Sequence, residues 1–339
     1  MKNDLLNQIL LCGLIIVSMV CTAEAAQEQD LIGVLQSNAG AVEKCAACQQ
    51  LRICGTAQSV AALAAVLGDE RVGHAARYAL EGMPYAEASA ALRDALGRTS
   101  GAIKAGLIDS LGRRRDKAAT PLLVPLLRDA DATIALAAAS ALGGIGDQTA
   151  AAALVAARDS RNPEVRLAVC EALLRCAEEC LRQGSKSEAS RIYHEVLEAE
   201  PPLALRLAAW RGEVLSDDAR RVKLVLEALT GSNEPLRLMA VTLVRETKDE
   251  EILKAGRRRW KSLGADAQAL VVGILAERGD RAALPEVLEA CRSSEPSVRL
   301  AGIQALGVLG DATNVALLTE RAARASGAAQ AAARAGLRV

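Results

Sequence analysis

The chain of 339 residues has very few aromatic side chains: no Phe, two Trp and three Tyr. Base-stacking and sugar-binding sites rely on such rings, and so do most large globular cores. An excess of charge of one sign is also missing, because 41 basic residues are balanced by 41 acidic ones. Such a balance provides no basic surface for nucleic acid or anionic lipid. We therefore expect no nucleic-acid partner.

Histidine is scarce as well, with His74 and His194 as its two positions. A zinc site needs four converging ligands, and these two residues lie in different parts of the chain. The sequence contains no nucleophile elbow, Walker loop or dinucleotide-binding fingerprint. It therefore predicts no catalytic residue, no metal ligand and no cofactor, and a protein that is not an enzyme.

What the chain has in abundance is Ala, Leu, Arg and Glu, which are strong helix formers. Apolar residues recur with a 31-residue period, in two series: Leu80, Leu111, Leu142 and Leu173, then Val244, Leu275 and Leu306. A period of this size indicates a solenoid of short supersecondary units. Extended to Leu51 and Leu337, the period predicts nine full repeats and a tenth that ends close to the last residue. We call residues related by this period equivalent.

Each repeat is expected to be a pair of helices. In the last full copy Pro296 lies at a helix start, where its missing N–H costs nothing. Gly310 ends that helix, and Asp311 opens the next one. Short connections place such helices antiparallel, and stacked pairs form a continuous core. The predicted fold is an all-α solenoid over residues 26–339.

The period is interrupted once, because Leu173 and Val244 are separated by two periods plus nine residues. We expect this nine-residue insertion within residues 180–202, with the repeat position of Leu306 falling at Glu213. Residues 188–197 within it look like the first helix of a tetratricopeptide unit. A tolerated insertion is the simpler interpretation.

The first 25 residues read as a targeting segment. Lys2 precedes an apolar run from Ile9 to Val20, which is short for a membrane span. Ala23-Glu24-Ala25 supplies the small residues that signal peptidase requires, so we place cleavage after Ala25. A lipid anchor on Cys21 is disfavoured, because Val20 stands where a lipobox has a small residue. The mature chain is expected to be periplasmic or extracellular and to have no membrane span.

The repeat resembles the HEAT-repeat family, in particular its short-period class associated with phycobilisome lyases. The likeness rests on an Asp/Glu-x-x-Val/Ile pattern that continues to Ala-Leu-Gly-x-x-Gly-Asp, at residues 131–147 and 295–311. The resemblance implies a right-handed superhelix whose second helices line the concave, partner-facing side. HEAT-type hydroxylases carry paired His-Glu iron motifs, whereas this chain has a single His-Glu, His194-Glu195.

Two charged columns run through the repeats. The acidic column, at positions equivalent to Asp311, comprises Asp116, Asp147, Asp218, Asp249, Asp280 and Asp311. The basic column, at positions equivalent to Arg299, comprises Lys104, Arg166, Arg206, Arg237 and Arg299. Acidic side chains can cap helix starts, contributing about 1 kcal/mol each. We expect the two columns to pair between neighbouring repeats and to fix their register. A recognition stripe is the alternative.

The candidate partner-binding column consists of the positions equivalent to Gln304, which are polar and differ from copy to copy. Its leading residues are Tyr78, Asp109, Glu171, Arg211 and Gln304. Tyr and Arg dominate interface hot spots, so Tyr78 and Arg211 are the expected anchors. Ordinary intrahelical pairs, Asp109 with Arg113 and Glu171 with Arg175, are the structural alternative.

The pair Cys45-x-x-Cys48 could suggest redox or metal chemistry. The period instead aligns Cys45, Cys48 and Cys54 with apolar core positions, and Cys170 and Cys176 likewise, so we expect thiols that pack as small hydrophobes. The runs Arg113–Arg115 and Arg257–Lys261 are expected to be solvated helix ends, with anion sites as the alternative.

Taken as a whole, the sequence indicates an exported, non-enzymatic protein-interaction scaffold of a bacterial envelope, whose protein partner it does not identify. The alternatives are a ligand- or chromophore-handling chaperone like the lyases, or the accessory domain of a larger extracytoplasmic enzyme. The Ala-rich last repeat is compatible with a chain that continues, or with a partner that covers this end.

Overall fold

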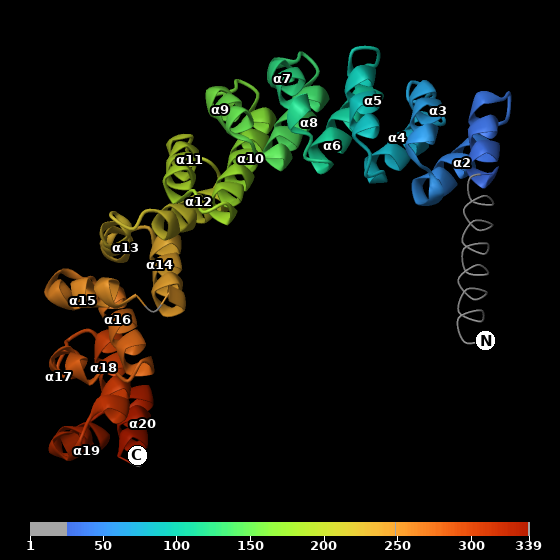
Figure 1. Ribbon diagram of the computed structural model, residues 1–339. Helices are drawn as coiled ribbons and strands as arrows, with labels where there is room; N and C mark the ends of the chain where they lie inside the picture. Colours follow the sequence, from blue (N-terminus) through green and yellow to red (C-terminus); the bar gives the residue numbers. More distant parts are fainter. Residues whose placement is uncertain (1–25, 248, 338–339) are drawn as a thin grey trace, which may run out of the picture. The chain divides into compact units, whose positions relative to one another are not determined.

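The computed structural model describes residues 26–247 and 249–337 (Figure 1). The predicted signal peptide, residues 1–25, lies outside the described residues. The described residues form helices and connecting loops without any β-strand, which confirms the predicted all-α solenoid. Two compact units are present. Unit 1 comprises the chain to Gly184 together with Glu198–Pro201, and unit 2 comprises Ser185–Leu197 and the chain from Pro202.

Unit 1 is a series of helix pairs. Residues 26–36 are helical. The α-helices that follow are α2 (Ala41–Cys54), α3 (Val60–Ala65), α4 (Gly73–Gly82), α5 (Ala86–Leu96), α6 (Gly101–Arg113), α7 (Thr120–Leu123), α8 (Ala132–Ile145), α9 (Gln148–Ala157) and α10 (Pro163–Arg182). Short 3-10 helices precede α3 and α7, and a third, Val124–Arg128, follows α7. Pro125 has no N–H for an α-helical hydrogen bond, which accounts for the change from α7 to a 3-10 turn.

Unit 2 continues the same pattern. Its α-helices are α11 (Lys186–Glu198), α12 (Leu203–Ser216), α13 (Arg221–Thr230), α14 (Glu234–Thr247), α15 (Glu250–Arg258), α16 (Ala265–Glu277), α17 (Leu284–Cys291), α18 (Pro296–Leu309), α19 (Val315–Arg324) and α20 (Gly327–Gly336). Within each unit every even-numbered helix packs against the next even-numbered one. We call these helices the even-numbered layer and the others the odd-numbered layer (Figure 1).

The 31-residue period marks the core of each unit. The residues that mark the period are less than 2% exposed as far as Leu306: Leu51, Leu80, Leu111, Leu142 and Leu173 in unit 1, and Val244, Leu275 and Leu306 in unit 2. Leu337, the last position of the period, is 38% exposed instead. Burying one such side chain contributes about 1.5–3 kcal/mol relative to leaving it in water. At the insertion the equivalent position is held by Glu213 in place of an apolar residue, and this side chain is also buried, with 2% exposed. Its carboxylate lies 2.9 Å from the Arg220 guanidinium, so the buried charge is paired.

Close helix contacts repeat with the same period in unit 1. A β-carbon on Gly112 of α6 would lie 2.6 Å from the Cα of Ala141 in α8. One period later, a β-carbon on Gly143 of α8 would lie 2.7 Å from the Cα of Ala172 in α10. Real β-carbons do not approach backbone this closely, so glycine lets the even-numbered helices pack at short distance.

The predicted insertion coincides with the boundary between the units. Helix α10 has 20 residues, whereas α8 and α18 have 14 each. It therefore continues past Cys176, the position equivalent to the last residue of α18. Gly184 then adopts φ of 80°, in the left-handed region, and α11 begins at Lys186. The extra residues thus lengthen α10, and α11 is also longer than its counterpart α9, with 13 residues against 10.

Candidate partner-binding surface

The candidate partner-binding column lies on the even-numbered layer and faces solvent. In unit 1 its members Gln49, Tyr78, Asp109, Ser140 and Glu171 are exposed. In unit 2 Thr242 and Gln304 are exposed, while Arg211 and Gly273 are half-buried. Shortly after them on each helix stand core residues such as Leu142 and Leu306. Helical geometry therefore turns one column inward and its neighbour outward.

Tyr78 is the largest apolar group of this column in unit 1, with 41% of its surface exposed. The guanidinium carbon of Arg52, from α2, lies 4.2 Å from the centre of the Tyr78 ring. A cation–π contact of this kind contributes about 0.5–1 kcal/mol at an exposed site. It joins neighbouring helices of the layer and holds the aromatic ring in a fixed position.

Asp109 lies beside a polar cluster between α4 and α6. The buried hydroxyl of Ser110 donates to Glu81 Oε2 at 2.7 Å and accepts from Arg77 at the same distance. Arg113 also pairs with Glu81, at 3.5 Å. Burial raises the pKa of the Asp109 carboxyl; the charges of Arg77 and Arg113 oppose this shift, and Glu81 adds to it. A partner that desolvates Asp109 further would have to supply a compensating cation or hydrogen-bond donor.

The intrahelical pairs that offered a structural alternative are not formed. Arg113 binds Glu81 of the preceding even-numbered helix instead of Asp109. Arg175 donates to the carbonyl oxygen of Ser140, at 3.3 Å, instead of pairing with Glu171. Within the described residues, neither Asp109 nor Glu171 has an ion-pair partner on its own helix. In unit 2, by contrast, Arg211 is already engaged, since it lies 2.7 Å from Glu246 of α14.

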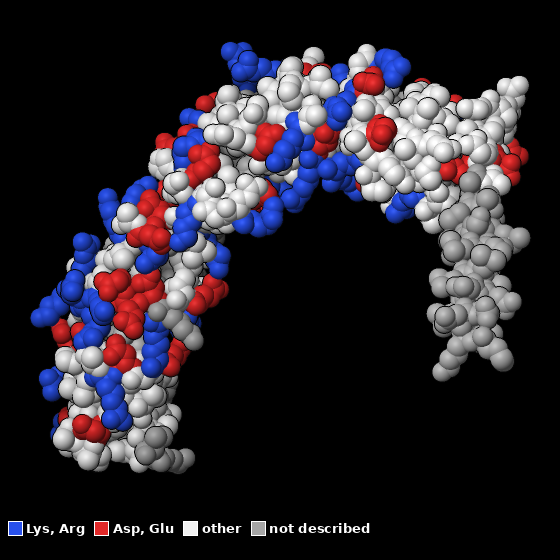
Figure 2. All heavy atoms as spheres, in the orientation of Figure 1, with Lys and Arg blue, Asp and Glu red and all other residues white. Residues whose placement is uncertain are grey.

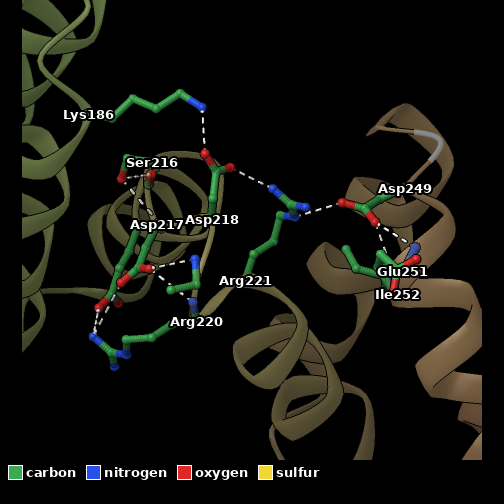
Figure 3. Close-up of polar contacts among 12 residues, drawn as sticks. Lys186, Ser216, Asp217, Asp218, Arg220, Arg221, Asp249, Glu251 and Ile252 are labelled. Carbon is green, nitrogen blue, oxygen red and sulfur yellow. Dashed lines mark hydrogen bonds and ion pairs between the residues drawn. The ribbon is translucent and has the colours of Figure 1, made fainter.

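The acidic column caps helices, as expected for five of its six members. The carboxylates of Asp116, Asp147, Asp249, Asp280 and Asp311 each accept a hydrogen bond from a backbone N–H two or three residues ahead. The sixth assignment was wrong by one residue: Asp217 makes this cap, to Ala219 and Arg220. Asp218 instead lies 3.0 Å from the Lys186 ammonium group and 2.6 Å from Arg221 (Figure 3).

Three members of the basic column have partners outside the acidic column. Arg166, Arg237 and Arg299 each donate to a carbonyl oxygen six residues earlier, in the loop before their own helix. Arg237 also lies 3.3 Å from Asp266, which is outside the acidic column. These arginines therefore form hydrogen bonds within their own repeats. A basic side chain that lies six residues from an unpaired carbonyl oxygen can bind that oxygen locally, without reaching the next repeat.

Ion pairs between repeats are made by arginines outside the basic column, including Arg257, which was expected at a solvated helix end. Arg93 pairs with Asp116, and the equivalent Arg257 lies 3.8 Å from Asp280, at the same separation along the chain. Arg221 reaches Asp249 at 2.6 Å, so Lys186, Asp218, Arg221 and Asp249 form one polar chain along unit 2 (Figure 3). The spacing of 23 residues that Arg93–Asp116 and Arg257–Asp280 share was the available signal.

Arg114 corrects the prediction of a solvated helix end. Its guanidinium donates to the carbonyl oxygens of Leu80 at 2.8 Å, Glu81 at 3.0 Å and Tyr85 at 2.9 Å, and also to Met83. Desolvation lowers the pKa of Arg114, although it stays charged. The flanking Arg115 also has a partner within the fold, since it lies 3.3 Å from Glu179.

Comparison with known proteins agrees with this geometry. A family model described as HEAT repeats matches residues 89–174 in unit 1 and 264–338 in unit 2. The chain carries HEAT repeats in both units. No curated protein matches it.

Among solved structures, the HEAT-repeat chain is similar to human deoxyhypusine hydroxylase, with 24% identity over 85% of this chain and 98% of that one and a TM-score of 0.36. It is also similar to the CpcE and CpcF complex of phycocyanin lyase from Nostoc, with 18% identity, 92% and 93% coverage and a TM-score of 0.29. The karyopherin Kap121p matches at 12% identity, over 92% of this chain and 41% of that one, with a TM-score of 0.42.

The cysteines of the HEAT repeats are mostly core residues. Cys48, Cys170, Cys176 and Cys291 are at most 1% exposed, as the period predicted for the first three. Burial raises the pKa of the Cys48 thiol to about 11 and of Cys176 to about 12, with smaller contributions from Cys45 and Cys180 respectively. Cys45 and Cys54 differ from the prediction, since they are only half-buried.

In the part of the chain that the structure describes, no three His, Cys, Asp or Glu side chains converge in a way that could hold a metal ion. None of the described helices is both long enough and apolar enough to cross a bilayer. His74 and His194 lie in units 1 and 2 respectively, on α4 and α11.

Proposed function

We propose that this HEAT-repeat protein is an exported, non-enzymatic scaffold of a bacterial envelope that binds one protein partner along the even-numbered layer. The observation that carries the proposal is the chemistry of the partner-binding column. Core positions of successive repeats hold the same residue types, whereas the outward column changes from Tyr to Asp, Ser and Glu. A surface that is regular in spacing but different at every step suits one extended partner.

The side chains of this column favour binding of a specific partner over nonspecific adsorption. Tyr78 is held by Arg52, and Asp109 sits among charges that are fixed by hydrogen bonds. Such groups lose little conformational entropy when a partner binds. The proposed export rests on residues 1–25 of the sequence.

Site-specific photocrosslinking tests the proposal. A photoreactive residue replaces Tyr78, Glu171 or Gln304 of the even-numbered layer in the producing cell. Matched controls replace Leu122, Glu227 or Glu320, which are also exposed but lie on the odd-numbered layer. One partner of defined mass, crosslinked from the even-numbered positions alone, is the expected result. Equal crosslinking from both layers, or a bound pigment that absorbs visible light in the purified protein, would contradict the proposal.

A further inference from the structure

The two arginine-rich runs of the chain are used very differently. In the first run, Arg113–Arg115, each guanidinium has partners within the fold. In the second run only Arg257 is engaged in this way: it lies 3.0 Å from Glu286 and donates to the carbonyl oxygen of Ala282. Within the described residues, the side chains of Arg258, Arg259 and Lys261 form no hydrogen bond or ion pair. Three cations in one short stretch are thus left without an internal partner.

These cations line a cavity of about 450 Å³ between the end of α15 and the start of α17. The other lining residues are Arg257, Trp260, Ser262, Pro285, Glu286 and Glu289. Figure 2 shows Lys and Arg side chains gathered over α15. Trp260 is 4% exposed, and its carbonyl oxygen accepts a 3.0 Å hydrogen bond from Gln268. The buried ring therefore anchors the turn on which Arg259 and Lys261 project outward.

The fold gives no reason for this concentration of charge. A cation in the last turn of a helix gains about 0.3–1 kcal/mol from the helix dipole, which accounts for Arg258 at the end of α15. Arg259 and Lys261 lie beyond that end. Like charges this close repel one another unless an anion lies between them. In the first run the fold provides partners for all three arginines. In the second run Arg258, Arg259 and Lys261 line a cavity without such partners.

We propose that this cavity binds a small soluble ligand that carries a phosphoryl group. Guanidinium groups bind phosphoryl oxygens through paired hydrogen bonds, and a lysine adds a third charge. The volume lies in the range of about 300–1,000 Å³ found for small-molecule sites. Glu289 on the opposite wall can accept hydrogen bonds from hydroxyl groups of the same ligand. It would repel a continuous anionic membrane surface, which favours a soluble ligand over a lipid headgroup.

Calorimetric titration of the full chain tests this site, with inorganic phosphate and glycerol 2-phosphate as probes in low-salt buffer. We expect a dissociation constant of about 1 mM or tighter for the phosphomonoester. The triple variant Arg258→Gln, Arg259→Gln, Lys261→Gln should bind at least about tenfold more weakly. The matched control, Lys223→Gln, Arg324→Gln, Arg334→Gln, removes the same charge from exposed positions of unit 2 outside the cavity. It should bind like the wild-type chain.

A second variant gives an effect of opposite sign. Glu289→Gln removes a negative charge from the cavity wall and should tighten phosphomonoester binding several-fold. The site is overturned if the wild-type chain binds neither probe, or if the triple variant and the matched control lose affinity equally. Binding to phosphatidic acid vesicles without binding to the soluble probes would overturn the soluble-ligand assignment. None of these results depends on the proposed protein partner.

Discussion

Arg278 donates a hydrogen bond of 2.9 Å to the carbonyl oxygen of Val244, 34 residues earlier in the chain. The equivalent Arg114 makes the same contact in unit 1, to Leu80 at 2.8 Å, again across 34 residues. Carbonyls in the last turn of a helix have no partner within that helix. An arginine just after one even-numbered helix therefore caps the end of the preceding one, and this links neighbouring repeats.

Arg114→Ala should destabilise unit 1 by about 2–3 kcal/mol, because several carbonyl oxygens at the end of α4 lose their donor at once. Denaturant unfolding measures the change, and hydrogen exchange should locate it at α4 and α5. Arg113→Ala, one residue away and largely exposed, is the control and should cost less than about 1 kcal/mol. Equal losses for the two variants would contradict the capping role.

Gly143→Ala should cost about 3 kcal/mol or more, because the new methyl group would collide with the backbone of Ala172 and force α8 and α10 apart. Gly273→Ala is a matched control within α16, where a β-carbon meets nothing within 4 Å. That substitution should stabilise the chain by about 0.5–1 kcal/mol through helix propensity. Thermal unfolding of both variants checks the contrast, and a Gly143→Ala protein as stable as wild type would refute the close-packing argument.

Asp249 has two roles that substitution can separate. Its carboxylate caps α15 through the N–H groups of Glu251 and Ile252, and it also pairs with Arg221 at 2.6 Å. Asp249→Asn keeps a capping oxygen and loses the ion pair, so we expect a cost of about 0.5–1 kcal/mol. Asp249→Ala should cost about 1 kcal/mol more. In the Arg221→Ala background the Asp249→Asn cost should vanish, which a double-mutant cycle measures.

Glu179 should make the stability of unit 1 depend on pH in the acidic range. Hydrogen bonds from Arg182 and Gln183, with the charges of Arg182 and Arg115, lower its pKa from 4.5 to about 2. Because the folded pKa lies below the unfolded one, the contribution to stability is complete above about pH 4.5. It is lost as the pH falls toward 2. Carbon NMR titration measures the pKa, and Arg182→Ala should raise it. Glu179→Gln should flatten the acid limb of the stability curve.

Thiol labelling at pH 8 should distinguish core cysteines from partly accessible ones. Burial raises the pKa of Cys48 and Cys291 to about 11 and of Cys176 to about 12, so little thiolate is present in the folded chain. These three and Cys170 should be alkylated only after unfolding, whereas half-buried Cys45 and Cys54 should react earlier. Mass spectrometry of the alkylated peptides gives the order. Early labelling of Cys48 would revive a redox role for Cys45-x-x-Cys48.

Much of the fold was readable from the sequence, because its main signal is local. A residue such as Leu142 is buried whenever its helix presents the apolar stripe to a neighbour, and the 31-residue period records that requirement at every repeat. The same logic identified Glu213 as the exception at the insertion, and the capping acids such as Asp147 and Asp311. Caps act within three residues, so sequence spacing is enough to find them.

Only the tertiary structure decided which charged groups meet between repeats. Arg113, Arg114 and Arg115 are alike in sequence, yet they point to a carboxylate on α4, to a set of carbonyls and to α10 respectively. Long, flexible side chains can reach many partners, and the distances between packed helices select among them. For the same reason the unpaired state of Arg258, Arg259 and Lys261 became visible only once every neighbouring acid was placed. Sequence determines what must be buried here, and packing determines what remains free to bind.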